Sequence, residues 1–306
     1  MALRPTGRAA WSLGAAAGVV ADRWLGEPPA SWHPLVGFGA VMGALERHLY
    51  RDRRTSGVVH AAVGLGVGLG AGRLVRSSAL ATTVAVGGRA LRDAARHVDV
   101  ALSAGDLEAA RARLVSLVGR ATQDLSATEI ARAVVESVAE NTVDAVVAPA
   151  LWAAWCGPAG ALGYRALNTM DAMVGHHSPR YENYGWASAR LDDLANWLPA
   201  RLTAVLVALV RPGSHRAVRE AVRRHAPAHP SPNAGVVEAA FAAALGRRLG
   251  GRNRYGEREE VRPFLGWGPS AQASDIERSV RLSRDVTRAL AGLLVVAGLA
   301  QWRWSS

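Results

Sequence analysis

Apolar runs long enough for helices alternate along the chain with short polar and basic segments. The runs lie at residues 9–21, 57–72, 77–88, 145–167, 202–210 and 286–300. Runs of this length predict helices that cross a membrane or pack against helices that do, and roughly four to six spans are compatible with them. No tandem repeat or low-complexity linker divides the sequence. We therefore predict an all-α, polytopic integral membrane protein in which residues 1–306 form a single helical domain with amphipathic cytoplasmic helices and loops.

The first apolar run and the glycine-rich run carry additional local signals. Arg4 and Arg8 precede the first run, as in a signal peptide. A proline-rich segment that resembles a functional loop follows directly at Asp22–Gly39. We therefore expect that the first run is not cleaved, and that it is either partly interfacial or buried against other helices. Gly64 and Gly68 have the GxxxG spacing, which predicts close packing of a membrane helix against a neighbour.

The sequence also predicts where helices begin and where they are interrupted further along the chain. Ser126 and Glu129 have the spacing of a capping box, which predicts a helix from Ala127. The pair Gly157-Pro158 interrupts the long apolar run that follows. The segment Asn253–Gly268 has several glycines and charges, and we predict that it forms a loop.

Charge and cysteine content exclude several classes of function. The formal net charge is +11 with 36 basic residues, and every one of them is arginine. A Walker A loop and Schiff-base catalysis both need lysine, so neither is present. No nucleic-acid motif accompanies the basic residues, and the apolar runs favour an anionic membrane surface as their partner. Cys156 is the single cysteine and is predicted to be a buried, inert thiol. A basic cluster predicts the first cytoplasmic segment: Arg47, His48, Arg51, Arg53 and Arg54.

Acids, amides and arginines recur among the apolar residues between positions 126 and 201. They form three sets, each beside the end of an apolar helix: Glu136, Glu140, Asn141 and Asp144; Asn168 and Asp171; Arg190, Asp192, Asp193, Asn196 and Arg201. Isolated charges in apolar surroundings are costly unless they are paired or bind a ligand. The arrangement predicts one shared pocket at the membrane face, completed by His33 and Asn233 from distant loops.

The first of these sets has the pattern of a magnesium site. Glu136 and Glu140 are four residues apart and therefore share one face of a helix, and Asp144 follows one turn later if that helix continues. Carboxylate and amide oxygens are the hard ligands that Mg²⁺ prefers. The ordinary alternative is a solvated acidic edge of a helix. The charge-free run after Asp144 favours the metal site over that alternative.

Several longer motifs follow one another in a fixed order. They are D-x-x-x-G-E-P-P…H-P at Asp22–Pro34, ESVAENTVD at Glu136–Asp144, VAP at Val147–Pro149, YRALNTMDAMVGH at Tyr164–His176, RY…GWASARLDDLANWLPARLT at Arg180–Thr203, HPSPNAG at His229–Gly235 and LGGRNRYG at Leu249–Gly256. In these motifs the chain resembles the CobD/CbiB family of cobalamin biosynthesis over nearly its whole length. It departs from the family with Ala121 where an acid is usual, Ala145 where glycine is usual and Glu27 where aspartate is commoner. These departures bear on local geometry.

The resemblance implies a ligase that forms an amide bond. The family joins adenosylcobyric acid, through a propionate carboxyl of the corrin ring, to (R)-1-amino-2-propanol or its O-phosphate. The product is adenosylcobinamide or its phosphate, and the enzyme is an adenosylcobinamide-phosphate synthase. ATP as cosubstrate and Mg²⁺ as metal are implied in the same way. Membrane lipid and other corrinoid-pathway membrane proteins are the implied partners, with no nucleic acid.

The resemblance also implies roles for the polar residues of the matched motifs. Candidates for Mg²⁺–ATP or amine binding are Glu136, Glu140, Asp144, Asp192 and Asp193. Of these, the candidate magnesium ligands are Glu140, Asp144 and Asp192. Asp171 is the candidate base that keeps the amine neutral. The expected binders of substrate phosphate are Arg190, Arg201, His33 and Asn233, and the expected binders of substrate amides are Asn141, Asn168 and Asn196.

Two other classes of function remain compatible with the residues. One is another Mg²⁺-dependent membrane transferase of the prenyl- or phospho-alcohol type, since such enzymes also bind diphosphate with aspartate-rich helices. The other is a non-enzymatic membrane transporter, which would need acids along a path between spans. The acids here lie near the ends of apolar runs, which favours a surface site. We expect a multi-pass protein of the cell membrane with its site on the cytoplasmic face.

Overall fold

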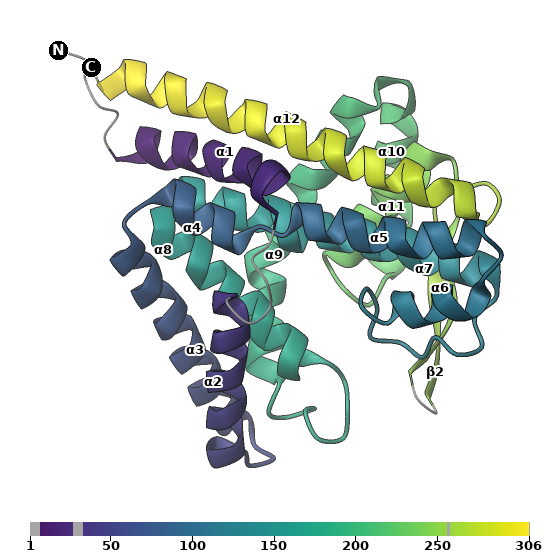
Figure 1. Ribbon diagram of the computed structural model, residues 1–306, viewed down its shortest axis with the longest axis horizontal. Coiled ribbons are helices and arrows are strands. Elements are labelled where there is room, and N and C mark those ends of the chain that lie inside the picture. The colour runs from purple at the N-terminus through teal and green to yellow at the C-terminus, as the bar shows by residue number, and fades with distance from the viewer. Residues whose placement is uncertain (1–6, 27–32, 256–257, 306) are drawn as a thin grey trace. The chain divides into compact units, whose positions relative to one another are not determined.

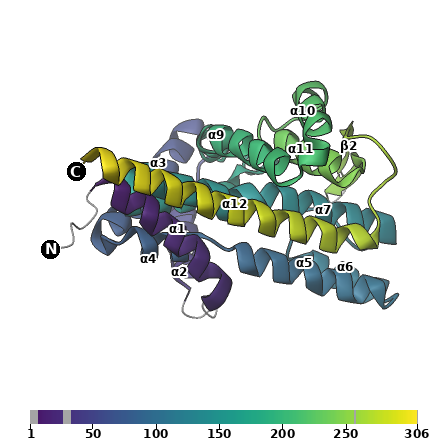
Figure 2. The same cartoon turned by 90° about the horizontal axis from the view of Figure 1, so that it is seen from above.

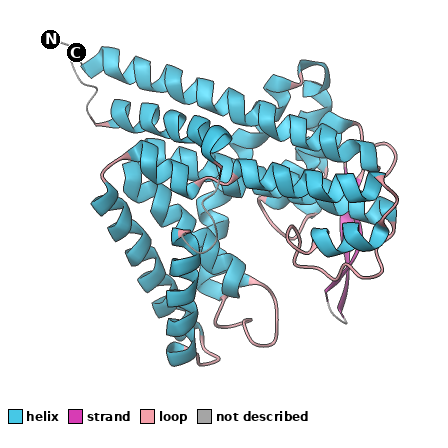
Figure 3. Ribbon diagram, viewed as in Figure 1, coloured by secondary structure: helices cyan, strands magenta, loops and turns pink. Residues whose placement is uncertain are grey.

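The computed structural model describes residues 7–26, 33–255 and 258–305 (Figure 1). Apart from one two-stranded hairpin, the regular elements of this part are helices (Figure 3), which confirms the predicted all-α class. The chain divides into two compact units. Unit 1 consists of Met1–Gly87, Asp144–Asn196 and Leu290–Ser306, and unit 2 of Gly88–Val143 and Trp197–Ala289. Glu27, Pro28 and Pro29 of the first matched motif lie outside the described residues.

Unit 1 is a group of helices around α8 (Ala148–Met170). The other elements are α1 (Arg8–Leu25), α2 (Pro34–Leu49), α3 (Arg54–Val75), α4 (Ser78–Ala85) and the π-helical segments η2 (Val143–Val147) and η3 (Asp171–Gly175), which flank α8. Helices α1, α3 and α4 all contact α8. Helix α1 also runs against α4 (Figure 2). Ala15, Ala16 and Val19 of α1 are buried. The first apolar run is therefore buried against other helices, as one of the two predicted alternatives required.

Glycines spaced four apart allow α3 to pack closely on α8. A Cβ added at Gly68 would lie 2.7 Å from the Ala166 Cβ, and one at Gly72 would lie 2.4 Å from the Ala159 Cα. At Gly66 and Gly70, on another face of α3, such an atom would meet nothing within 4 Å. The predicted close packing at the GxxxG spacing is thus confirmed, and it continues for one more turn.

Helix α8 is broken where the sequence predicted an interruption. Gly157 has a φ of 65°, in the left-handed region that favours glycine, and Pro158 follows it. The Gly157 Cα lies against the indole of Trp11, because an added Cβ would be 2.8 Å from the Trp11 Cε2. The prediction for Cys156 was wrong: this residue is exposed. Cys156 lies on the outer face of α8. The apolar residues around it in the sequence had suggested a core position.

Unit 2 consists of helices and the hairpin. Its elements are α5 (Gly88–Ser103), α6 (Leu107–Leu114), α7 (Ala127–Thr142), α10 (His215–Arg224), α11 (Ala234–Leu245), β1 (Leu249–Tyr255), β2 (Arg258–Leu265) and the short 3₁₀ turns η4 (Pro212–Ser214) and η5 (Ala226–Ala228). Helices α9 (Trp186–Val210) and α12 (Ala273–Ser305) contribute residues to both units. Because the two units share these helices, the division does not decide whether the chain is one domain, and the single domain stays a prediction.

Helix α7 begins as the sequence predicted and continues without a break. Ser126 accepts a hydrogen bond from the Glu129 N–H, and the Glu129 carboxylate accepts one from the Ser126 N–H at 2.9 Å, which completes the capping box. From Ile130 to Ala139 every residue is buried. At its other end α7 runs into η2, so the helix does persist past Asn141. Both π-helical segments carry a candidate aspartate, Asp144 in η2 and Asp171 in η3, and such segments are frequent at functional sites.

The segment Asn253–Gly268 does not form the predicted loop. Strands β1 and β2 pair antiparallel, with Asn253 opposite Glu260. The ladder is irregular between Leu249 and Gly251, where Gly250 and Gly251 have φ values of 84° and 100°. Glycines with positive φ mark a bulge as well as a loop, and the charged residues of both strands hide the alternation that would identify them. Gly256, within the predicted loop, lies outside the described residues.

Three helices in the described residues are long and apolar enough to cross a membrane: Arg54–Val75, Ala127–Gly175 and Trp186–Val210. This is fewer than the roughly four to six spans that the apolar runs allowed. The run at residues 9–21 forms α1, which also carries Arg8, Asp22 and Arg23. The run at 77–88 forms only the 8 residues of α4, because Arg76, with a φ of 56°, separates it from α3, and the backbone is already extended at Val86.

Candidate functional site

A polar cavity of about 200 Å³ lies within unit 2. Helix α7 forms one wall with Glu136, Ser137 and Glu140, and the segment before α7 adds Arg120. Glu238 reaches the cavity from α11 and Arg262 from β2, and the remaining lining residues are Leu117, Val118, Gly119 and Ala133. Two guanidinium groups and three carboxyl groups thus face one small space. Such a space can hold a ligand that carries both an anionic group and an amine.

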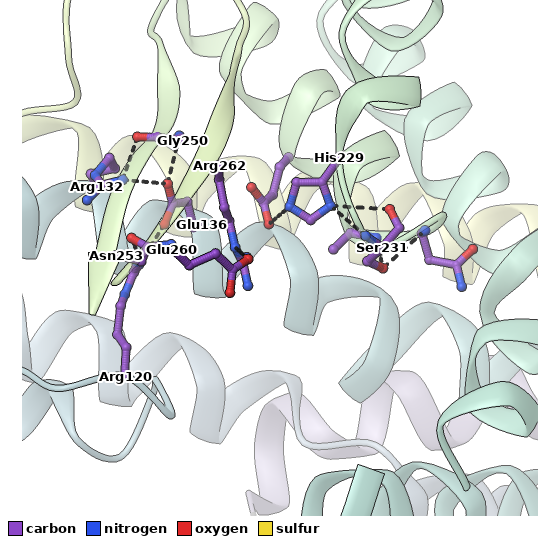
Figure 4. A network of polar contacts seen from close by, with 12 residues as sticks. Arg120, Arg132, Glu136, His229, Ser231, Gly250, Asn253, Glu260 and Arg262 are labelled. Atoms are coloured by element: carbon purple, nitrogen blue, oxygen red, sulfur yellow. Dashed lines mark hydrogen bonds and ion pairs between the residues drawn. The ribbon is translucent and has the colours of Figure 1, made fainter. Parts of the chain in front are cut away.

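Glu136 is held by hydrogen bonds on both carboxylate oxygens (Figure 4). Oε2 accepts from the Arg120 Nη2 at 2.6 Å, and Oε1 accepts from the backbone N–H of Gly250 at 2.9 Å. Arg132, one turn earlier on α7, has its Nη1 3.7 Å from the Glu136 Oε1 and donates to the carbonyls of Gly250 and Arg252. Glu136 therefore ties the hairpin to α7 and orients Arg120.

Arg120 and Arg262 are both positioned by acceptors in or beside the hairpin. Arg120 donates a second hydrogen bond to the Asn253 side-chain oxygen. The Nε of Arg262 donates to the Glu260 carboxylate at 3.2 Å (Figure 4). Because the guanidinium group has five donors in a fixed plane, a group held on one edge can still donate on another. Both arginines can therefore bind an anion in the cavity.

Glu140 differs from its neighbour Glu136 in having an exposed side chain at the cavity. Its carboxylate accepts no hydrogen bond from the residues that the structure describes. A solvent-accessible carboxylate next to two arginines is able to bind an ammonium group or accept a proton. The structure thus gives different surroundings to Glu136 and Glu140, which the sequence analysis had placed in one set.

Glu238 and His229 form a buried pair behind the cavity. The His229 Nε2 is 3.9 Å from the Glu238 Oε1, and the two side chains are 1% and 2% exposed. The His229 Nδ1 contacts the backbone of Ser231, accepting from its N–H at 3.1 Å (Figure 4). Burial raises the pKa of the Glu238 carboxyl well above its usual range, and the Glu136 and Glu140 carboxylates raise it further. Burial lowers the pKa of the His229 imidazole.

Unit 1 contains a second polar cluster that unites residues from all three predicted sets. The Tyr164 hydroxyl lies 2.8 Å from the Asn196 Oδ1 and 3.4 Å from the Asp144 Oδ1. Asp192 accepts hydrogen bonds from the Asn196 amide at 2.9 Å and from the Asn168 amide at 3.3 Å. Asp144, Asn168, Asp192 and Asn196 are thus brought together around a tyrosine whose role the sequence did not indicate. Tyr164, Asp192 and Asn196 are buried.

The other predicted site residues have local partners. Arg190 pairs with Asp193 at 3.9 Å. Arg201 donates to the Asn233 Oδ1 at 3.2 Å and to the Trp197 carbonyl at 2.8 Å. Asp171 lies against Gly175, whose added Cβ would be 1.9 Å from the Asp171 Oδ1.

His33 and Asn141 also bond within their own segments. The His33 Nδ1 accepts from the Leu35 N–H at 3.2 Å and so caps α2. The Asn141 amide donates to the Ser137 carbonyl one turn earlier, at 2.9 Å. Both contacts are ordinary structural roles for these residue types. Substrate binding by these two residues stays a prediction.

The magnesium prediction can be compared with the donor groups present. Within the described residues no group of three or more His, Cys, Asp or Glu side chains could hold a metal ion. Of the three predicted ligands, Asp144 and Asp192 belong to the cluster around Tyr164, and Glu140 belongs to the cavity of unit 2. Mg²⁺ bound with nucleotide phosphates needs only one or two protein carboxylates. Asp144 and Asp192 fit that requirement, and the prediction stays open.

Sequence reasoning missed Arg120, Arg262, His229 and Tyr164 as members of these clusters. Arg120 and Arg262 lie in polar segments where arginine is common, and the fold alone brings them to α7. His229 and Tyr164 stand inside matched motifs, and that was the available signal. Glu238 had a stronger one, because it interrupts the apolar sequence of α11.

Comparison with known proteins identifies the chain's relatives. The family described as CobD/Cbib protein matches residues 15–283. Cobalamin biosynthesis protein CobD of Mycobacterium tuberculosis (strain CDC 1551 / Oshkosh) is 48% identical over 93% of this chain and 95% of its own length. The proteins of the same name from Chromobacterium violaceum and a strain of Rhodobacter capsulatus are 44% and 40% identical over 85% and 93% of this chain, and 88% and 95% of their own lengths. No solved structure gives a significant match. The chain therefore belongs to the CobD/CbiB family of cobalamin biosynthesis.

Proposed function

We propose that this protein catalyses ATP-dependent amide formation between a propionate carboxyl of adenosylcobyric acid and (R)-1-amino-2-propanol or its O-phosphate. The observation that carries the proposal is the cavity of unit 2, in which Arg120 and Arg262 face Glu140. An amide-forming enzyme must hold an acid and an amine side by side. Arginines and an accessible carboxylate in one small polar space meet that need.

The chemistry explains why phosphate transfer accompanies amide formation. A carboxylate is a poor acyl donor because its oxygen is a poor leaving group. Attack of the propionate oxygen on the γ-phosphorus of ATP releases ADP and gives an acyl phosphate. The amine nitrogen then attacks the acyl carbon, loses a proton and expels inorganic phosphate. Donors that stabilise the oxyanion of this second step lower its barrier, and positioning dominates the first.

Within unit 2, each group of the cavity has a role in this scheme. Arg120 and Arg262 bind the anionic side of the reactants, either the carboxylate or a phosphate. Glu140 binds the amine and takes up the proton that it loses, since its carboxylate is accessible. Glu136 is a positioning residue, because both of its oxygens are occupied by Arg120 and Gly250.

Within unit 1, the cluster around Tyr164 is suited to the nucleotide phosphates. Asp144 and Asp192 would hold Mg²⁺, which when bound neutralises the charge of the phosphate oxygens. Asn168 and Asn196 fix the Asp192 carboxylate by donating to both of its oxygens. A carboxylate held by two amides loses little conformational freedom when it binds a ligand.

We further propose that the protein is a multi-pass protein of the cell membrane, with its site on the cytoplasmic side. The support is the basic segment between α2 and α3, where Arg51 and Arg53 follow the exposed His48. Basic loops remain on the cytoplasmic side of membranes. Labelling of single cysteines in Cys156→Ala protein tests this, because a cysteine placed at Arg53 should react only with reagents that reach the cytoplasm.

The reaction itself is tested with purified protein in lipid or detergent. Adenosylcobyric acid, ATP and each of the two amines are supplied, and the corrinoid products are identified by mass spectrometry. We expect the product mass to equal acid plus amine minus one water, with one ADP released per product. Turnover of a prenyl diphosphate or an alcohol phosphate, without corrinoid product, would identify a membrane transferase of another type and refute the proposal.

A further inference from the structure

An apolar groove of about 740 Å³ lies in unit 2, apart from the polar cavity, between the end of α9 and helices α10 and α11. Its volume is within the range of about 300–1,000 Å³ typical of small-molecule sites. Val205, Ala208 and Leu209 of α9 form one wall, and Val218 of α10 and Val236 of α11 form the other. The groove is therefore a surface that favours hydrocarbon.

The ionisable residues among the described lining of the groove are all basic: Arg201, His215, Arg219 and Arg223. Arg219 and Arg223 are one turn apart on α10 and are exposed. Neither has a hydrogen bond or ion pair with a residue that the structure describes, whereas Arg224 on the same helix pairs with Glu220 at 2.9 Å. Two adjacent guanidinium groups without a counter-charge favour an anionic ligand.

The apolar wall of the groove belongs to a helix that is able to cross a membrane. The groove residues of α9 lie near the end of the candidate span Trp186–Val210. Val205 and Leu209 are 55% and 67% exposed, so hydrocarbon can reach the groove along this helix. Helix α10 has its basic residues on one side and buries Val218 and Ala221 on the other, which is the pattern of a helix at a membrane interface.

We infer that this groove binds one anionic phospholipid. An acyl chain lies between the two apolar walls, against Val205 and Ala208 on one side and Val236 on the other, and the phosphate lies between Arg219 and Arg223. A soluble anion would bind the arginines but leave the apolar side chains of the groove in water. A zwitterionic lipid would bring a cation to a groove whose ionisable lining residues, among those described, are all basic. Charge and apolarity together select the anionic lipid. The inference is independent of the proposed reaction, because the lipid contacts are assigned to Arg219 and Arg223, and Arg201 is the one named lining residue that was also expected to bind substrate.

The test uses full-length protein and native mass spectrometry. Phosphatidylglycerol and phosphatidylcholine with identical acyl chains are titrated separately into delipidated protein. We expect tighter binding of phosphatidylglycerol, and a loss of about twenty-five-fold in that preference when Arg219→Gln and Arg223→Gln are combined, since each arginine near an anionic headgroup contributes about a factor of five. Arg216→Gln with Arg224→Gln is the matched control. It removes the same charge from α10 at residues outside the groove lining, and should keep the preference.

A second variant separates the groove from general surface charge. Ala208→Trp places a large side chain in the groove without changing the charge, and we expect it to weaken the binding of both lipids. Equal binding of the two lipids to the unmodified protein would overturn the inference. So would equal effects of the two arginine pairs, or displacement of phosphatidylglycerol by millimolar inorganic phosphate, which would identify a phosphate site. The arginine variants lie on an exposed helix face, so they answer the question even if Ala208→Trp fails to fold.

Discussion

Glu136 and Glu140 lie one turn apart on α7, but their carboxylates have different surroundings. Glu136 is buried between Arg120 and Gly250, and Arg132 lies on its other side. Glu140 is exposed at the cavity and has no such partners among the described residues. A buried carboxylate between two arginines is a structural group, because removing it leaves two buried positive charges without compensation.

Conservative substitutions should therefore separate stability from activity. We expect Glu136→Gln to reduce the free energy of unfolding by about 3–5 kcal/mol, the usual loss on breaking a buried ion pair. Glu140→Gln should leave unfolding unchanged and abolish amide formation. Thermal unfolding in detergent and mass spectrometry of the corrinoid products measure the two effects. Retained activity in Glu140→Gln would remove this residue from the proposed chemistry.

The buried pair of His229 and Glu238 contributes two opposite terms to the pH dependence of stability. The pKa of Glu238 is raised by burial, so its favourable contribution is complete below its unfolded pKa of about 4.3 and is lost as pH rises. The pKa of His229 is lowered by burial, so protonation below about pH 6.5 favours the unfolded chain and stability increases as pH rises towards that value. The charged groups that act electrostatically on the pair are Arg120, Arg262, Glu136, Glu140 and Glu260.

Removing one member should reveal the pH dependence of the other. In Glu238→Gln, we expect the unfolding temperature to rise with pH up to about 6.5, the pKa of an unfolded histidine, and then remain level. In His229→Gln, it should fall steadily from about pH 4.5 upward. Thermal unfolding measured every half pH unit distinguishes the two curves. Parallel curves for the two variants would contradict the opposite pKa shifts.

The residues of the two clusters show what a sequence can and cannot predict at this scale. Asp144, Asn168, Asp192 and Asn196 were all predicted, because acids and amides among apolar residues are conspicuous. Their grouping with Tyr164 was not, since a tyrosine in an apolar helix is ordinary. Arg120 and Arg262 were missed because they lie far apart in the sequence, each in a polar segment. The fold brings both arginines to one cavity. A local sequence pattern does not predict that two such distant residues lie close together in space.

The two glycine faces of α3 provide a test at the scale of one helix. Gly68→Ala and Gly72→Ala would place a methyl group within 2.7 and 2.4 Å of α8, and we expect each to destabilise unit 1 by about 1–3 kcal/mol, as overpacking does. Gly66→Ala and Gly70→Ala, on a face with nothing within 4 Å, are the matched controls. They should be neutral or stabilising by up to about 1 kcal/mol, because alanine favours helix more than glycine. Equal effects on both faces would mean that α3 does not pack on α8 in this register.

Helix ends were more predictable than the hairpin for a physical reason. A capping box depends on residues three apart, so Ser126 and Glu129 were sufficient to locate the start of α7. The break of α8 at Gly157 likewise depends on one glycine and the proline after it. The hairpin depends on contacts with α7, where Glu136 and Arg132 bond the backbone at Gly250. Its strands have little apolar alternation of their own, so their pairing cannot be read from the segment alone.

At the scale of the whole molecule, the cavity of unit 2 and the cluster around Tyr164 lie in different units. The predicted shared pocket combined residues that belong to both, and the structure assigns Asp144 and Asp192 to unit 1 and Glu136 and Glu140 to unit 2. In the proposed reaction the two clusters have separable tasks. We propose that unit 1 binds Mg²⁺ and nucleotide phosphates and that unit 2 binds the amine and the carboxylate. This division predicts distinct kinetic defects.

Asp192→Asn should therefore affect magnesium and ATP, and Glu140→Gln should affect the amine. We expect Asp192→Asn to raise the Mg²⁺ concentration needed for half-maximal Mg²⁺–ATP binding by about tenfold or more, since one of two carboxylate ligands is lost. Calorimetric titration measures this without turnover. Glu140→Gln should bind Mg²⁺–ATP normally, and any residual activity should require more aminopropanol. Glu46→Gln, which removes an acid of unit 1 paired with Arg180 and outside the cluster, is the control and should change neither property. If Asp192→Asn and Glu140→Gln weakened magnesium and amine binding equally, the two clusters would not have separate tasks, and the assignment of phosphates to Asp144 and Asp192 would be wrong.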